Sequence, residues 1–273
     1  MENFAGRVAV VTGGASGIGR AMARAFAAEG MDVVIADVEA AALDATAKEL
    51  DVVAHRLDVS QADEVAALAD AVMAQFGRVD IVANNAGVGG GGFISDLTLN
   101  DWQWVLGVNL WGVIHGIQSF LPHLLENPEG GHLVNTASIA GLIAGPYIGP
   151  YNASKYAVVA ISETLSKELA MSGSSTKVSV LCPGYVRTNI FDSQRTRPAT
   201  LSDGKGPNRN SLANNDDIKA AAAALAIEPD QVAADVLAAV REERFWIFTH
   251  PEMMGMVADR ADEINAAVAQ ATH

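Results

Sequence analysis

The sequence has few of the features that would assign it to a disulfide-rich, membrane or secreted class of protein. It contains a single cysteine, Cys182, so an internal disulfide bond is excluded and a reducing compartment is expected. No run of about 18 consecutive apolar residues occurs, and we therefore expect no membrane-spanning helix. The opening residues, MENF, lack the basic patch and apolar core of a signal peptide. These absences predict a cytoplasmic protein without a membrane partner.

Positive charge is also scarce. The chain has 18 Lys and Arg residues against 32 Asp and Glu residues, which gives a formal net charge of −14. A surface of this sign repels phosphate groups, and this argues against a nucleic-acid partner. The six histidines are scattered without the spacing of metal ligands, so we predict no catalytic metal. The length of 273 residues leaves room for one large α/β domain or two small ones.

A glycine-rich turn follows the first predicted strand. Residues 7–12 (RVAVVT) are rich in β-branched side chains and lack helical periodicity, which is typical of a buried strand. Residues 13–19 (GGASGIG) come next and lead into a helical pattern, and this order presents backbone N–H groups to a phosphate. No lysine follows Gly19, so the turn is not a Walker P-loop. A plain tight turn between a strand and a helix is the alternative interpretation.

An aspartate closes the second predicted strand, residues 32–37 (DVVIAD). Asp37 lies where an acidic side chain accepts hydrogen bonds from the adenosine ribose in a βαβ dinucleotide fold. At ~4 Å a carboxylate repels each unit charge of the NADP 2′-phosphate by up to about 4 kcal/mol, and Val38 brings no positive charge to offset it. We therefore predict NAD as the cofactor, with NADP disfavoured. An aspartate that merely starts the next loop is the alternative.

Predicted strands and helices alternate through the rest of the chain. This order indicates a parallel sheet that carries its ligand at the carboxyl edge. The glycines at 89–92 follow the fourth strand and either border a pocket or form a mobile surface turn. Pro122 is expected to bend or loosen the helix in which it lies. Further strands are expected at residues 52–57, 79–83, 132–137, 178–182 and 245–249, and helices at residues 40–50, 62–76, 99–126, 151–171, 219–226 and 229–243.

Residues 151–155 (YNASK) place a tyrosine and a lysine at helical spacing. On a helix, Tyr151 and Lys155 lie one turn apart and share a face. An ammonium group stabilises a nearby phenolate, so we expect the pKa of Tyr151 to fall from about 10 toward neutrality. Of the neighbouring tyrosines, neither Tyr147 nor Tyr156 has a lysine at this offset. Because such pairs also arise by chance on solvated helix faces, the assignment depends on partners elsewhere in the chain.

Three motifs together point to a family. They are Thr12-Gly13-x3-Gly17-x-Gly19, Asn84-Asn85-Ala86-Gly87 and Tyr151-x3-Lys155. In this order and spacing they resemble the short-chain dehydrogenase/reductase family, over roughly residues 5 to 250. The resemblance implies an α/β fold of Rossmann type: a doubly wound, seven-stranded parallel sheet with helices on both faces, in a single dinucleotide-binding catalytic domain spanning 1–273. It also implies a homo-oligomer, usually a tetramer, with a dimer as the alternative.

The resemblance assigns roles to two further polar residues. It makes Ser138 a hydrogen-bond donor to a substrate oxygen, and because no G-x-S-x-G pattern surrounds this serine it is not expected to be a nucleophile. It makes Asn109 the residue that holds a water near Lys155 in a proton relay, whereas the apolar neighbours of Asn109 also fit a satisfied core amide. The predicted catalytic residues are Asn109, Ser138, Tyr151 and Lys155.

The resemblance also supplies cofactor contacts. The turn after the sixth strand is expected to face the nicotinamide, with the Val186 backbone and the Thr188 hydroxyl meeting its carboxamide. The predicted cofactor-binding residues are Gly13, Ser16, Gly17, Ile18, Gly19, Asp37, Asp58, Val59, Asn85, Ala86, Gly87, Tyr151, Lys155, Pro183, Val186 and Thr188.

Residues 189–226 are the candidate substrate lid, because they begin with a long polar stretch rich in Pro, Gly, Asn and Ser. Basic residues outnumber acids between 187 and 209, and they either attract an anionic substrate or belong to a solvated loop or an interface. The tail at 250–273 is expected to pack on a neighbouring subunit. The basic residues of the loop are Arg187, Arg195, Arg197, Lys205 and Arg209.

Hydride transfer between NAD(H) and a secondary alcohol or ketone is the predicted activity, with Tyr151 as general acid and base. Apolar residues around the predicted pocket favour a bulky, partly hydrophobic small molecule, such as a steroid-like, aryl or alicyclic compound. A non-catalytic dinucleotide-binding sensor or scaffold is the alternative, and it leaves Ser138, Tyr151 and Lys155 unexplained. A methyltransferase also uses a glycine-rich loop but gives no reason for the Tyr-Lys pair.

Overall fold

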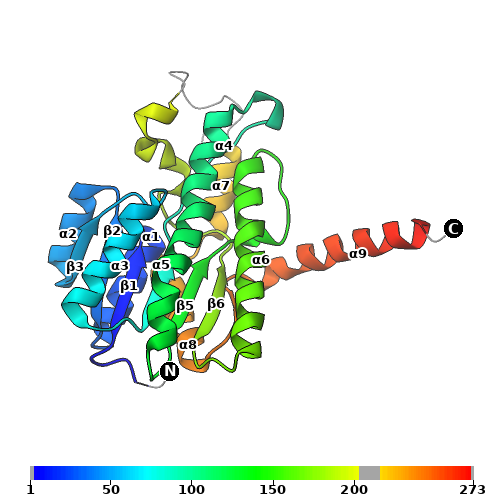
Figure 1. Cartoon of the computed structure of the whole chain (residues 1–273). Helices are drawn as coiled ribbons and strands as arrows, with labels where there is room; N and C mark the ends of the chain where they lie inside the picture. Colours follow the sequence, from blue (N-terminus) through cyan, green and yellow to red (C-terminus); the bar gives the residue numbers. More distant parts are fainter. Residues whose placement is uncertain (1–2, 203–215, 272–273) are drawn as a thin grey trace.

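The computed structural model describes residues 3–202 and 216–271. Within these residues, one parallel sheet contains seven strands in the order β3-β2-β1-β4-β5-β6-β7, and helices cover both of its faces (Figure 1). This confirms the predicted Rossmann-type doubly wound fold. The strands are β1 (Val8–Thr12), β2 (Asp32–Asp37), β3 (Val53–Arg56), β4 (Ile81–Asn84), β5 (His132–Thr136), β6 (Lys177–Cys182) and β7 (Trp246–Phe248).

Two hydrophobic layers hold the helices to the sheet. Alternate side chains of β1 point to opposite faces. Val8 and Val10 join the core shared with α3, α5 and α6, whereas Ala9 and Val11 join the core shared with α1, α2 and α8. The helices are α1 (Gly17–Ala28), α2 (Ala40–Leu50), α3 (Ala62–Phe76), α4 (Leu99–Leu106), α5 (Gly112–Glu126), α6 (Gly149–Met171), α7 (Asp216–Leu225), α8 (Pro229–Glu242) and α9 (Met254–Ala271).

The order of the strands reverses at β1, which pairs with β2 on one side and with β4 on the other. The connections after β1 and β4 therefore leave in opposite directions, and this opens a crevice at the carboxyl edge of the sheet. The glycine-rich turn follows β1, and the Asn-Ala-Gly motif follows β4. The topology thus brings both motifs to the same place.

The helix predicted at 99–126 is interrupted at a different position from the one expected. A π-helical segment, η2 (Gly107–Trp111), joins α4 to α5, and α5 continues through Pro122. Pro122 lies near the end of α5, where a missing N–H removes one hydrogen bond without ending the helix. The stretch is long and apolar enough to cross a membrane by composition, but α5 packs against α3 and buries Phe120 in the core. It is a core helix.

The chain after β6 is more ordered than a plain polar loop. Between residues 189 and 202 it forms the short 3₁₀ helices η4 (Ile190–Thr196) and η5 (Ala199–Leu201). Residues 203–215 of the predicted lid lie outside the described part of the chain. At the C-terminus, α9 extends away from the body of the protein (Figure 1), and no residue of this helix is buried. Its packing on a neighbouring subunit stays a prediction.

Candidate active site

A cavity of about 1460 Å³ opens at the carboxyl edge of the sheet. It exceeds the roughly 300–1,000 Å³ of ordinary ligand pockets, so it has room for a dinucleotide together with a substrate. With one exception, Gly19, all of the predicted cofactor-binding residues line it. Of the predicted catalytic residues, Ser138, Tyr151 and Lys155 line it and Asn109 does not.

The glycine-rich turn has a shape that only glycine allows. Gly13 and Gly17 have φ angles of +67° and +53°, in the left-handed region. A Cβ on Gly13 would stand 2.8 Å from the Ala86 Cα, and a Cβ on Gly19 would overlap the Gly13 carbonyl oxygen. Gly19 therefore acts by closing the turn rather than by lining the cavity. The turn leaves the N-terminus of α1 facing the cavity, which fits the pyrophosphate of a dinucleotide.

Asp37 presents its carboxylate at one end of the cavity. One oxygen accepts a hydrogen bond from the Ala15 N–H at 3.1 Å, and the other accepts one from the Glu39 N–H at 3.0 Å. Burial raises the pKa of Asp37, while these two hydrogen bonds oppose the rise. The backbone thus holds the carboxylate in place at the edge of the cavity, and its remaining lone pairs suit the ribose hydroxyls of NAD.

A hydroxyl that was not among the predicted site residues ties the two motifs together. Thr12 Oγ1 accepts hydrogen bonds from the backbone N–H groups of Asn85 and Ala86 at 2.9 and 3.1 Å, and donates to the Ala83 carbonyl. The Asn85 side chain donates to the Thr12 carbonyl and accepts from the Thr136 hydroxyl. The Asn85 amide therefore binds the ends of β1 and β5 to the end of β4.

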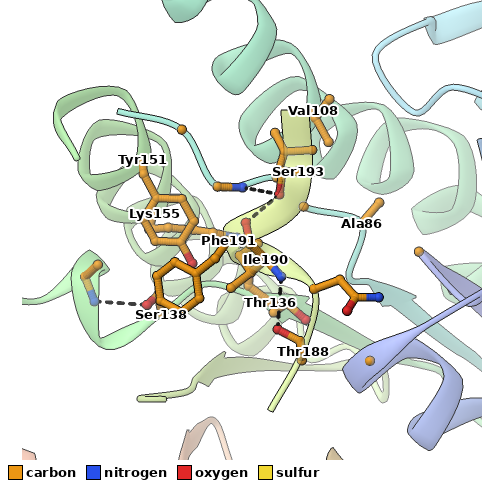
Figure 2. Close-up of a pocket in the computed structure, with 18 of the residues that line it drawn as sticks. Ala86, Val108, Thr136, Ser138, Tyr151, Lys155, Thr188, Ile190, Phe191 and Ser193 are labelled. Atoms are coloured by element: carbon orange, nitrogen blue, oxygen red, sulfur yellow. Dashed lines mark hydrogen bonds between the residues drawn. The ribbon is translucent and has the colours of Figure 1, made fainter. Parts of the chain in front are cut away.

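Tyr151 and Lys155 lie one turn apart on α6, as predicted. Lys155 Nζ lies 5.6 Å from the centroid of the Tyr151 ring and donates a hydrogen bond to the Thr136 carbonyl at 2.8 Å. Ser138 follows β5; its hydroxyl accepts from the Ala140 N–H at 3.1 Å and lies within hydrogen-bonding reach of Tyr151. Figure 2 shows the three side chains grouped in the wall of the cavity.

The pKa of Tyr151 departs from the sequence prediction. Burial raises the pKa of the Tyr151 phenol, and the hydrogen bond with Ser138 only partly opposes the rise. Burial also lowers the pKa of Lys155 to about 8. The predicted lowering of the Tyr151 pKa by Lys155 is therefore wrong for this structure, because desolvation is the largest cause of the shift and the contact that opposes it is with Ser138 rather than with Lys155. The sequence spacing identifies the Tyr151–Lys155 pair, but it does not show the burial that determines the charge of each group.

Asn109 is fully buried in the π-helical segment, and its side chain is already satisfied. Its amide nitrogen donates to the Val88 carbonyl at 2.9 Å and to the Ser154 hydroxyl at 3.4 Å, while its oxygen accepts from the Val88 N–H at 2.8 Å. These contacts match the core-amide alternative. The amide fixes the chain just after Gly87, and its predicted role in a water relay stays a prediction.

The remaining predicted contacts lie on loops around the opening. Thr188 packs so closely on the glycine turn that a Cβ on Gly17 would stand 3.0 Å from the Thr188 methyl group. The Val59 carbonyl contacts the His115 ring at 2.9 Å, and the Asp58 side chain accepts from the Ser60 N–H at 2.9 Å. Asp58 and Val59 follow β3 on the Asp37 side of the cavity, where the Leu57 N–H donates to the Asp37 carbonyl at 3.1 Å.

The basic residues of the loop are engaged with acids. Arg187 pairs with Glu228 at 2.6 Å and Arg197 pairs with Asp101 at 2.6 Å. Arg195 pairs with Glu39 across the cavity opening, at 2.6 Å. The sequence left open whether these residues attract an anionic substrate, and their pairing favours a structural role. Lys205 and Arg209 lie outside the described residues.

Comparison with known proteins agrees with this geometry. A family model described as short chain dehydrogenase matches residues 7–199. A short chain dehydrogenase/reductase from Burkholderia phymatum, crystallised in complex with NAD, is 43% identical and superposes with a TM-score of 0.94, covering 98% of this chain and 97% of that one.

Two curated relatives are similar over nearly the whole chain. The CLA biosynthesis dehydrogenase/reductase of Lactiplantibacillus plantarum is 32% identical over 97% of this chain and 95% of its own length. The 1-deoxy-11-beta-hydroxypentalenate dehydrogenase of Streptomyces exfoliatus is 34% identical over 94% of this chain and 88% of its own length. The chain belongs to the short-chain dehydrogenase family. By this membership it is an oxidoreductase.

Replacing Lys155 by Met tests the burial of the ammonium. The pKa of Lys155 is about 8 in the folded protein against an ordinary value of 10.5, so between these values the unfolded chain binds the extra proton. The stability of the wild type therefore gains up to about 3 kcal/mol from this group as the pH rises through this window, and Lys155→Met lacks that gain. Urea unfolding of both proteins across the window measures the difference; parallel pH curves would contradict the assignment.

Proposed function

We propose that the protein transfers hydride between NAD(H) and a secondary alcohol or ketone, with Tyr151 exchanging the alcohol proton. One observation carries the proposal: Ser138, Tyr151 and Lys155 converge on one wall of a cavity whose other end holds the glycine turn and Asp37. NAD supplies the donor or acceptor of hydride when bound. The protein's own side chains position the substrate and move the proton.

Ser138 orients the reacting oxygen next to Tyr151 by a hydrogen bond. In ketone reduction Tyr151 donates its proton to that oxygen, and in alcohol oxidation it removes the proton. Burial favours the neutral phenol, which is the form that reduction needs. Lys155 offsets the negative charge of the phenolate that forms, and by family resemblance it holds the nicotinamide ribose. Asn109 supports this wall through Val88 and Ser154.

NAD is the proposed cofactor in preference to NADP. The Asp37 carboxylate is fixed by two backbone N–H groups, so it cannot turn away from a 2′-phosphate without losing both bonds. Glu39, close by, is paired with Arg195 at 2.6 Å, so the repulsion comes from Asp37. Val38, between them, is 40% exposed and carries no charge. Like charges at this range disfavour the phosphate.

The substrate is proposed to be bulky and partly hydrophobic. The cavity beyond the catalytic wall is bordered by aromatic and aliphatic side chains, and residues 189–202 of the proposed lid form part of its rim. The name of the Streptomyces relative, a hydroxypentalenate dehydrogenase, supports an alcohol substrate. The apolar lining residues include Val88, Trp104, Ile143, Tyr147, Phe191, Leu201, Met253 and Met256.

Two further properties belong to the proposal. Family resemblance supports a homo-oligomer, a tetramer or a dimer, and the α9 helix, in which no residue is buried, is available for contact with another subunit. The composition supports a cytoplasmic location. A non-catalytic sensor or scaffold finds no support among the relatives, which are described as dehydrogenases.

Tyr151→Phe removes the proton donor and keeps the ring. We expect turnover to fall by about 10³-fold, because proton transfer by a positioned side chain contributes about 10²–10⁴-fold, while NADH affinity changes by less than about threefold. NADH fluorescence titration and absorbance assays across a panel of alicyclic and aryl alcohols measure both quantities. Near-normal turnover in this variant would contradict the proton-transfer role of Tyr151.

Asp37→Ala tests cofactor choice. Removing the carboxylate takes away the hydrogen bonds to the ribose and the repulsion of a 2′-phosphate. We expect kcat/KM to fall about tenfold or more with NAD and to rise with NADP, so that the ratio of the two shifts by about 10²-fold. Initial rates with each cofactor and one alcohol give this ratio. An unchanged ratio would show that Asp37 does not face the adenosine ribose.

A further inference from the structure

One ion pair joins two segments that are 156 residues apart in the sequence. Arg195, in η4, donates through Nε to Glu39 Oε2 at 3.1 Å and through Nη2 to Glu39 Oε1 at 2.6 Å. The side chains are 31% and 29% exposed, so solvent screens the pair only in part. The two-point geometry is the strong form of an arginine–carboxylate interaction. Both residues line the cavity.

The same guanidinium also holds its own loop together. Arg195 Nη1 donates to the Asp192 carbonyl at 2.8 Å and to the Asn189 carbonyl at 3.3 Å. All three guanidinium nitrogens therefore donate hydrogen bonds. The bonds to the Asp192 and Asn189 carbonyls fix the Arg195 side chain to the short helix η4. A shift of η4 away from the cavity breaks the contact with Glu39.

A second contact ties η4 to the opposite wall of the cavity. The Ser193 hydroxyl accepts from the Gly89 N–H at 2.9 Å and donates to the Ile190 carbonyl at 2.7 Å (Figure 2). Gly89 comes shortly after the motif that follows β4, whereas Glu39 is the N-cap residue of α2, two residues after the end of β2. The loop thus spans the cavity from the β4 side to the β2 side.

The Arg195–Glu39 end of this span lies at the carboxylate proposed to bind the adenosine ribose. The Glu39 N–H donates to Asp37 at 3.0 Å, and the charge of Glu39 is among the causes that raise the pKa of Asp37. A ligand that lies between the glycine turn and Asp37 therefore lies beside this ion pair.

We propose that Arg195 and Glu39 are positioning residues that hold η4 across the dinucleotide site, so that NADH leaves only when this ion pair breaks. The inference rests on the proposed placement of NAD at Asp37 and the glycine turn. Loops that close over a bound cofactor often set its rate of release. Here the closing contact is made at the adenosine end, away from Tyr151.

Stopped-flow release of NADH tests the proposal, with NADH fluorescence followed as excess NAD displaces it. The variants are Glu39→Gln, Arg195→Gln and the double variant, with Glu29→Gln as the matched control, because Glu29 pairs with Arg241 at 3.0 Å and neither residue lines the cavity. We expect each single variant to release NADH about fivefold faster, as for loss of a favourable partly exposed pair. The double variant releases it no faster than the singles, and Glu29→Gln matches the wild type.

The two single variants change the net charge in opposite directions. A purely electrostatic effect on the cofactor would therefore move their release rates in opposite directions, whereas loss of a shared contact moves both the same way. Opposite changes, unchanged rates, or a double variant whose acceleration equals the product of the singles would overturn the proposal.

Hydrogen exchange without cofactor gives a second readout. Backbone amides of residues 190–196 should exchange faster in Glu39→Gln and Arg195→Gln than in the wild type, and unchanged exchange would overturn the proposal. Release rates measured in a Tyr151→Phe background separate this inference from the proposed reaction. Faster NADH release in the Tyr151→Phe background, which lacks turnover, supports the role of the ion pair even if the catalytic assignment is wrong.

Discussion

The hydrogen bond from Lys155 Nζ to the Thr136 carbonyl is the contact on which the site depends. A buried ammonium needs a hydrogen-bond partner. The partner of the Lys155 ammonium is the Thr136 carbonyl, at the carboxyl end of β5. The bond fixes α6 against the sheet edge and places Tyr151 beside Ser138. The cost of burying the charge is visible in the lowered pKa of Lys155, about 8. Because burying this charge lowers stability, we infer that it is retained for its role at the active site.

One side of the cavity is formed by the ends of the strands, and the other side is formed by the loop that contains η4. On the strand side, Thr12 and Asn85 join the ends of β1, β4 and β5 through their own hydrogen bonds, so the glycine turn and the catalytic wall keep a fixed separation. On the other side, η4 reaches across the opening and is held by Ser193 and Arg195. The parallel sheet brings both halves to its carboxyl edge.

The sequence predicted the features that depend on local pattern. Strand, turn and helix order determined the sheet, and Tyr151 and Lys155 share a helix face because α6 contains both. Features that depend on distant residues were not predictable. Nothing near position 195 indicates a partner at Glu39. The raised pKa of Tyr151 comes from burial, which motif spacing does not report. The contacts of Asn109 with Val88 also come from a distant segment, and its role in a water relay stays a prediction.

The central claim is that Lys155 makes Tyr151 a usable proton carrier despite its burial. The most direct measurement is the pH dependence of hydride transfer in a single turnover, with NAD and an alcohol, in the wild type and in Lys155→Met. The account predicts a rising limb in the wild type as the Tyr151 phenol loses its proton, and a limb displaced upward by at least about one pH unit in the variant, which lacks the ammonium that offsets the phenolate charge. The same limb in both proteins would contradict the account.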